Sequence, residues 1–138
     1  MLAVVGFYKG ATPHCRLKIS GMDPNTAIEF EAVIDTGFDG FIMMPLSSAV
    51  PLGLVGRITT DVILADGSRV PRSVAEGIAQ LEDLSHPGLI ILQEEAQEVM
   101  VGMDFIRTFG LMLVIGKEFV LLANEAEVSK RAAAARPS

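Results

Sequence analysis

The 138-residue sequence has no tryptophan, one tyrosine and a single cysteine, Cys15. A lone cysteine excludes a disulfide within the chain, and together with the lack of a signal peptide it favours a reducing, cytoplasmic location. So few aromatic side chains give no platform for stacking on bases, and the net charge of −6 argues against nucleic acid or an anionic membrane as a partner. No apolar run approaches the roughly 18 residues of a membrane-spanning helix.

Candidate metal ligands are also few. His14 and Cys15 are adjacent, but no second pair of ligands follows at zinc-site spacing, so we interpret both as surface or strand residues. The carboxylates of Glu94, Glu95 and Glu98 are interpreted as part of a solvated loop or edge strand rather than a cation site. The sequence therefore predicts neither a metal nor a cofactor.

Apolar residues, in contrast, make up 50% of the chain, and the mean hydropathy is +0.44. This composition and length are typical of one ordered domain with a substantial core. Turn residues recur at short intervals, and the runs between them are rich in Val, Ile, Leu and Phe. That spacing predicts an all-β barrel or sandwich.

Individual strands can be placed by alternation. In residues 27–34 the side chains of Ile28, Phe30, Ala32 and Ile34 fall on one face of a strand. Residues 57–81 are predicted to form a long hairpin with a two-residue turn at Asp66-Gly67. Residues 109–123 are predicted to form a second hairpin that turns near Gly116-Lys117, and His86 before Pro87-Gly88 is interpreted as a loop residue.

Helical signals are short. Residues 45–50 could form a turn or two of helix capped by Ser47-Ser48. Residues 103–109 predict a short helix that opens near Gly102 and carries Asp104 in its first turn, where a carboxylate is favourable. We expect one domain over residues 1–123 and a helix-prone or disordered tail over 124–138.

The segment "AVIDTGFDGFIMMP", residues 32–45, places Asp35-Thr36-Gly37 inside an apolar run. A buried carboxylate is costly unless it is paired or neutralised. Glycine permits a close approach of the backbone, so that its amide can point at the carboxylate, and threonine adds a hydroxyl donor and acceptor. On the tripeptide alone, a solvated turn between two strands is favoured over a functional loop, because such tripeptides occur in many turns.

Three motifs in order distinguish these readings. They are the Asp-Thr-Gly after an apolar strand, the hairpin with Asp66-Gly67 at its tip, and "VGMDFI" at residues 101–106 before an apolar strand. Over residues 14–123 the sequence resembles the retropepsin-like aspartic proteases, above all the cellular and bacterial retroviral-like members such as the DNA-damage-inducible protein family. The resemblance implies an all-β, single-domain acid-protease barrel with a flap hairpin and one short helix near its C-terminal end.

The resemblance also implies roles for individual residues. Asp35 would activate the attacking water, Thr36 would lock two loops across a twofold axis, and the Gly37 amide would brace the carboxylate. Asp39 matches a position that contacts the substrate backbone. A flap containing Ala65, Asp66 and Gly67 would cover the bound peptide. In such enzymes two carboxylates share one proton, and this chain contains a single Asp-Thr-Gly, so the resemblance implies a homodimer.

The implied activity is that of an aspartic endopeptidase acting on extended, apolar peptide or protein substrates. Two departures from the family keep an alternative open, a non-proteolytic module for dimerisation or peptide binding. Viral members usually carry arginine where this chain has Met103, which removes the expected partner of Asp39. The predicted flap is also less glycine-rich than theirs.

Overall fold

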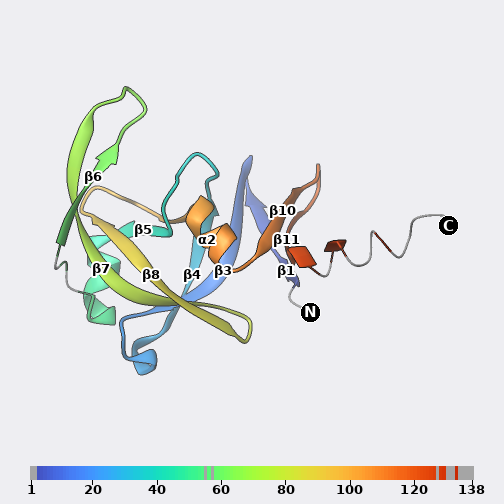
Figure 1. Cartoon of the computed structure of the whole chain (residues 1–138), viewed down its shortest axis with the longest axis horizontal. Coiled ribbons are helices and arrows are strands. Elements are labelled where there is room, and N and C mark those ends of the chain that lie inside the picture. Colours follow the sequence, from blue (N-terminus) through green and yellow to red (C-terminus); the bar gives the residue numbers. More distant parts are fainter. Residues whose placement is uncertain (1–2, 55, 57, 127, 130–132, 134–138) are drawn as a thin grey trace.

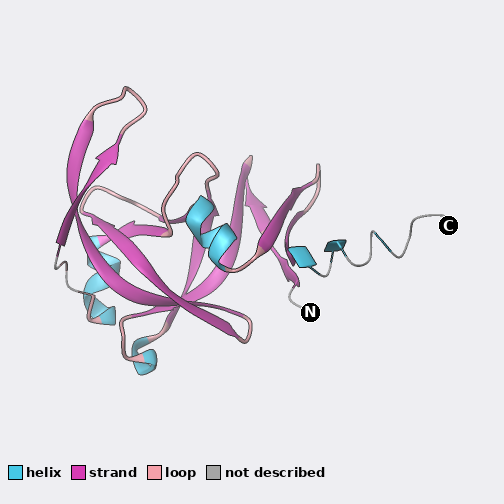
Figure 2. Cartoon of the chain, in the orientation of Figure 1, coloured by secondary structure: helices cyan, strands magenta, loops and turns pink. Residues whose placement is uncertain are grey.

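The computed structural model describes residues 3–54, 56, 58–126, 128–129 and 133. Eleven strands alternate with short helical segments in the described part of the chain (Figures 1 and 2). The strands are β1 (Ala3–Val5), β2 (Phe7–Lys9), β3 (Thr12–Ser20), β4 (Ile28–Ile34), β5 (Ile42–Pro45), β6 (Ile58–Ile63), β7 (Arg69–Leu81), β8 (Leu84–Gln93), β9 (Val99–Val101), β10 (Leu111–Ile115) and β11 (Val120–Asn124). The helices are α1 (Leu46–Ala49) and α2 (Met103–Thr108), with 3₁₀ turns η1 (Pro24–Thr26) and η2 (Val50–Leu52).

Six of these strands close into a barrel in the order β3-β4-β9-β5-β8-β7, because β7 pairs back onto β3. Strands β2 and β6 extend this sheet beyond the closed ring. The pairs β4–β9 and β5–β8 are parallel, and the remaining pairs of the ring are antiparallel. The all-β, single-domain barrel predicted from the sequence is confirmed.

A separate three-stranded antiparallel sheet has the order β1-β11-β10, which joins the N-terminal strand to the C-terminal hairpin. Figure 1 shows this sheet beside the barrel, with the turn between β10 and β11 on the same side of the molecule as the loop between β4 and β5. The expected hairpin near Gly116 is confirmed, and the Gly116 amide closes it with a hydrogen bond of 2.8 Å to the Phe119 carbonyl oxygen.

The alternation predicted for β4 is confirmed where the strand enters the core. Ala32 and Ile34 are buried, whereas Glu29 and Glu31 are exposed. Ile28, at the start of the strand, remains 43% exposed. Burial thus increases along β4 toward residue 35. At this end of β4 both neighbouring strands are present, with β3 on one side and β9 on the other.

The long hairpin β6–β7 is present, but its turn differs from the predicted two-residue form. The Leu64 amide donates to the Ser68 carbonyl oxygen and the Gly67 amide donates to the Leu64 carbonyl oxygen, so three residues form the loop. Gly67 adopts φ of +86°, the left-handed conformation that such a loop requires at its last position. The hairpin tip therefore lies at Asp66-Gly67 as predicted, but its loop has three residues instead of two.

Residues 86–88 were predicted to be a loop, and this is wrong. His86, Pro87 and Gly88 lie within β8, and the chain reverses instead at Glu82-Asp83. Gly88 serves close packing, since a Cβ there would meet the ring of Phe41. Pro87 is tolerated because β5 pairs with β8 only from Ile90 onward, which leaves one side of this stretch without a neighbouring strand.

The two predicted helices are present. Ser47 and Ser48 do not cap the first one, because Pro45 occupies the N-cap position of α1 and both serines lie within the helix. For α2 the sequence was right: Gly102 is the N-cap, Asp104 lies in the first turn, and Gly110 ends the segment at φ of +63°. Most of the predicted tail lies outside the described residues. No described helix is long and apolar enough to cross a membrane.

Candidate active site

Asp35 lies at the end of β4, where the strand leaves the barrel core. Its backbone amide donates a hydrogen bond of 3.0 Å to the carbonyl oxygen of Val101 on the neighbouring strand β9. The last residue pair between the parallel strands β4 and β9 is Ile34 with Val101, and Asp35 follows it directly. Asp35 itself is partly buried.

A tight turn then presents the carboxylate. The Gly37 amide donates to Asp35 Oδ1 at 2.9 Å, and the Phe38 amide donates to the Asp35 carbonyl oxygen at 3.2 Å. Thr36 and Gly37 are exposed at the outer surface of the loop. The bond to Oδ1 restricts the rotation of the carboxyl group.

Helix α2 holds the rest of this loop. The amides of Gly102 and Met103 donate to the carbonyl oxygens of Phe41 and Phe38, at 3.2 and 2.8 Å. The Asp104 amide is shared between the carbonyl oxygens of residues 39 and 40, at 3.1 and 3.2 Å. The first amides of a helix lack partners within the helix, so the loop satisfies them and is in turn fixed by them.

Two glycines make room for the ring of Phe38. A Cβ on Gly40 would lie 2.5 Å from Cζ of that ring, and a Cβ on Gly102 would lie 2.6 Å from its Cδ2 atom. The Cβ on Gly102 would also lie 2.5 Å from the Gly40 carbonyl oxygen. The loop and the start of α2 therefore pack so closely that side chains are excluded at both positions.

A groove of about 270 Å³ borders the loop. It is lined on one side by residues 37–40 and on the other by Asp61, Val62 and Ile63 of β6, with Ile91 of β8. Strand β6 belongs to the hairpin that stands away from the barrel in Figure 1. The groove thus runs between the Asp-Thr-Gly loop and the flank of the predicted flap.

The structure brings some of the predicted site residues together. Asp35, Thr36, Gly37 and Asp39 form one loop, and Gly37 and Asp39 line the groove. The predicted flap residues Ala65, Asp66 and Gly67 are exposed at the tip of the β6–β7 hairpin and are not among the residues that line it. Their contact with a substrate stays a prediction.

Sequence reasoning missed several residues of the site. Phe38 and Asp61 line the groove, and Val101 and Gly102 position the loop. Gly102 carried a signal, because a glycine between an apolar strand and a helix indicates a close approach. The position of Asp61 had no such signal, since it depends on how the β6–β7 hairpin faces the loop across the groove.

Met103 occupies the position where the sequence resemblance to viral proteases led us to expect an arginine. Its side chain is partly buried against the core, and its amide is one of those that bind the loop. Asp39 is exposed, and no cation of the described residues lies within ion-pair distance of its carboxylate. Main-chain hydrogen bonds to α2 therefore hold this loop without an arginine–aspartate pair.

His14 and Cys15 do not form a joint site. They are consecutive residues of β3, so their side chains point to opposite faces of the sheet. Both are buried, which corrects the surface alternative, and burial raises the pKa of the Cys15 thiol to about 12. Within the described ranges no three His, Cys, Asp or Glu side chains gather as metal ligands would.

The fold was compared with known proteins. No protein-family model matches the sequence, and no curated protein matches it. Among solved structures, a retropepsin-like aspartic protease from Rickettsia conorii aligns with a TM-score of 0.62 at 10% identity, over 88% of this chain and 86% of that one. EIAV protease complexed with the inhibitor HBY-793 aligns with a TM-score of 0.60 at 15% identity, over 79% of this chain and 98% of that one. This chain therefore has the fold of the retropepsin-like aspartic proteases.

Proposed function

We propose that the protein is an aspartic endopeptidase that works as a homodimer. The observation that carries the proposal is the Asp35 carboxylate, which the Gly37 amide orients at 2.9 Å on a loop that borders the groove. Asp35 lies on a retropepsin-like fold, and one solved structure of that fold contains a bound inhibitor. The chain has one Asp-Thr-Gly, so a second copy supplies the second carboxylate.

The reaction follows from two Asp35 carboxylates that share one proton. The ionised carboxylate takes a proton from a water molecule, whose oxygen attacks the carbonyl carbon of the peptide bond. The protonated carboxyl group stabilises the developing oxyanion. Collapse of the tetrahedral intermediate breaks the C–N bond, and the leaving nitrogen receives a proton from the pair. The products are a carboxylic acid and an amine.

Exposed apolar side chains support the second copy. Ile115 and Phe119 flank the turn between β10 and β11 and are each 51% exposed. Val5 on β1 and Met112 on β10 are 72% and 37% exposed on the three-stranded sheet. This turn and the loop between β4 and β5 lie on the same side of the molecule in Figure 1, and a twofold partner that contacts both would have to approach from that side.

The groove gives the expected substrate class. Phe38, Val62, Ile63 and Ile91 present apolar surface, and an extended peptide laid along the groove passes the Asp35 loop. Such a peptide would form main-chain hydrogen bonds with loop and hairpin, while alternate side chains enter apolar pockets. Closure of the β6–β7 hairpin would then exclude bulk water from the reacting bond.

The test is the change Asp35→Asn, measured with an apolar-rich peptide library at mildly acidic pH. We expect cleavage to fall by at least about a thousandfold, because the amide cannot hold and transfer the shared proton. The dimer and the thermal unfolding of the variant should match those of the parent. Cleavage by the variant at the parent's rate would disprove the proposal. Peptide binding by a parent that cleaves nothing from acid to neutral pH would identify a peptide-binding module instead.

A further inference from the structure

The groove beside the Asp35 loop has a carboxylate on each of its two walls. Asp39 belongs to the loop that carries Asp35, and Asp61 belongs to strand β6 of the facing hairpin. Among the described residues no basic side chain lines the groove. The other side chains that line it are apolar, namely Phe38, Val62, Ile63 and Ile91. Asp39 and Asp61 are called the groove carboxylates below.

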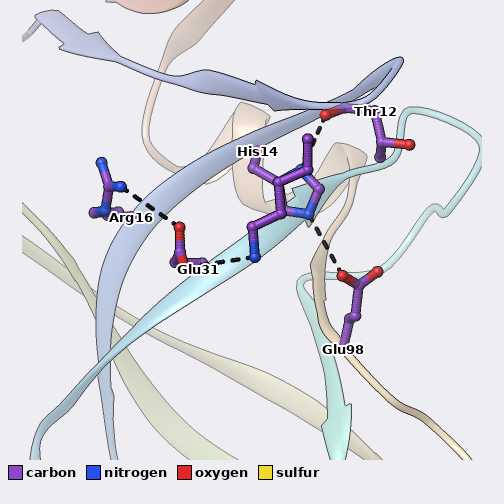
Figure 3. Close-up of polar contacts among 6 residues, drawn as sticks. Thr12, His14, Arg16, Glu31 and Glu98 are labelled. Carbon is purple, nitrogen blue, oxygen red and sulfur yellow. Dashed lines mark hydrogen bonds and ion pairs between the residues drawn. The ribbon is translucent and has the colours of Figure 1, made fainter.

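Neither groove carboxylate has a partner in the part of the chain that the structure describes. Both are exposed, and neither takes part in an ion pair or a side-chain hydrogen bond there. Glu31 is a contrasting case in Figure 3, because Arg16 lies 3.5 Å from its carboxylate, and Lys9 contacts the same group at 3.4 Å. Figure 3 also shows the Glu98 carboxylate, 3.5 Å from Nε2 of the buried His14. The groove carboxylates have no such neighbour.

Two arginines lie on the hairpin that contains Asp61, but neither compensates its charge. Arg72 is one residue pair nearer the base of the hairpin, so its side chain points to the other face, and it lies 4.0 Å from Glu95. Arg69 is on the same face as Asp61, two residue pairs nearer the tip, and forms no ion pair with it. Within the described residues, Asp61 is thus open to a cation from a bound molecule.

Apolar walls with two carboxylates fit one kind of peptide side chain. Lysine and arginine have a long apolar stem and a cationic head, so the stem can lie on the apolar walls while the head meets a carboxylate. An uncharged peptide that covers the groove would remove water from the carboxylates without replacing it by a partner, which is costly. An acidic peptide side chain would be repelled. The net charge of −6 acts in the same direction, because it attracts cationic peptides over a longer range.

We propose that Asp39 and Asp61 make the groove select a peptide that carries a basic side chain, lysine or arginine, among its apolar residues. As a statement about substrates, this selectivity rests on the function proposed above. Asp35 performs the reaction, and the groove carboxylates choose the peptide. They belong to separate elements, so the loop and the hairpin each contribute one negative charge to the groove.

The first test measures peptide binding without cleavage, in the Asp35→Asn variant. A fluorescent apolar peptide carries lysine, glutamine or glutamate at each position in turn, and fluorescence anisotropy gives the affinity. At the best position we expect lysine to bind at least about fivefold more tightly than glutamine, and glutamate to bind more weakly than both. Equal binding of all three at every position, or no binding of any peptide, would overturn the proposal.

Substitution of the groove carboxylates tests whether they cause the preference. Asp61→Asn and Asp39→Asn, each in the same background, should lower the ratio of lysine to glutamine affinity by at least about threefold. Asp83→Asn is the matched control and should keep the ratio, because Asp83 is an exposed carboxylate at the turn between β7 and β8, outside the groove lining. A ratio that persists in both groove variants would refute the proposal.

Charge reversal gives a result that a loss of structure cannot imitate. Asp61→Lys should bind the glutamate peptide more tightly than Asp61→Asn does, and the lysine preference should shrink at high ionic strength because exposed charges are screened. The same ranking should appear in kcat/KM of the active parent. Selective binding by a parent that cleaves nothing would contradict the proposed endopeptidase and support the selectivity for a bound peptide. Cleavage without a preference for a basic residue would contradict the selectivity alone.

Discussion

Gly102 packs directly against the main chain of Phe38, and a Cβ at position 102 would lie against the Phe38 carbonyl oxygen and 2.6 Å from Cδ2 of its ring. The same region contains the 2.8 Å hydrogen bond from the Met103 amide to that oxygen. The start of α2 and the loop that carries Asp35 thus form one rigid unit. This close packing requires glycine, which has no side chain, at position 102.

This relationship makes Gly102→Ala a sharp test of loop packing. The added methyl group meets backbone rather than a movable side chain, so we expect the free energy of unfolding to fall by about 1–3 kcal/mol, as measured by urea denaturation. Gly37→Ala is the matched control, because its Cβ would meet only Asp35 Oδ1 at 3.2 Å. Equal losses in the two variants would contradict the proposed packing.

The proposed dimer predicts that a charge introduced at the interface weakens dimerisation, whereas a charge introduced elsewhere on the surface does not. Phe119→Lys places a cation on the side of the molecule that carries the Asp35 loop, and we expect it to weaken the dimer at least about tenfold, since a charge is costly in a buried interface. Met22 is 58% exposed and lies two residues before η1, the blue helical turn at the bottom of Figure 1, away from the turn between β10 and β11. Met22→Lys should leave the sedimentation profile unchanged. A dimer equally sensitive to both changes would place the interface elsewhere.

Cys15 gives a prediction about alkaline pH. Burial raises its pKa to about 12 from an ordinary value of 9.0, so the native thiol keeps its proton while the unfolded thiol ionises. Between these values the unfolded state binds fewer protons, and the free energy of unfolding therefore falls as pH rises above about 9. Cys15→Ala should lose this alkaline decline, although it also leaves a small cavity that lowers stability at every pH. The native thiol should react with a thiol reagent only after urea unfolds the chain.

For Asp66, at the tip of the β6–β7 hairpin, we predict the opposite pH dependence, with stability that falls as pH falls. The Ser68 hydroxyl and amide donate to its Oδ1 at 2.6 and 2.9 Å, and they hold the pKa of that carboxyl below its usual value. A lowered pKa stabilises the tip above the unfolded value of about 3.9, and the contribution is lost as pH falls through the lower folded value. Carboxyl carbon shifts of Asp66 should report this titration, and Ser68→Ala should move it upward. An unchanged titration would show that the hydroxyl plays no part.

The sequence predicted those parts of the fold that depend on neighbouring residues. Alternation in β4, the position of the hairpin tip at Asp66-Gly67 and the Gly102 start of α2 are local properties, and each was found where expected. It failed at Pro87-Gly88, where a typical turn pair lies inside β8. There the ring of Phe41, far away in the sequence, packs against the glycine and decides the outcome.

The candidate site shows the same division. The residue types of Asp35, Thr36 and Gly37 and their order after an apolar strand were enough to predict a braced carboxylate, because the bond from Gly37 spans only two residues. The long-range groups were invisible in the sequence. Asp61 lines the groove because the β6–β7 hairpin faces the loop across it, and His14 lies near Glu98 because β3 and β9 flank β4 on its two sides.

By itself, then, the sequence determined an all-β chain with a carboxylate loop, a hairpin and a short helix, since periodicity and turn chemistry act over a few residues. The tertiary structure alone decided that main-chain hydrogen bonds from α2 hold the loop, and that a buried histidine lies beside the Thr12 carbonyl oxygen and the Glu98 carboxylate. Both depend on contacts between segments that are far apart in the sequence, and no local pattern connects these atoms.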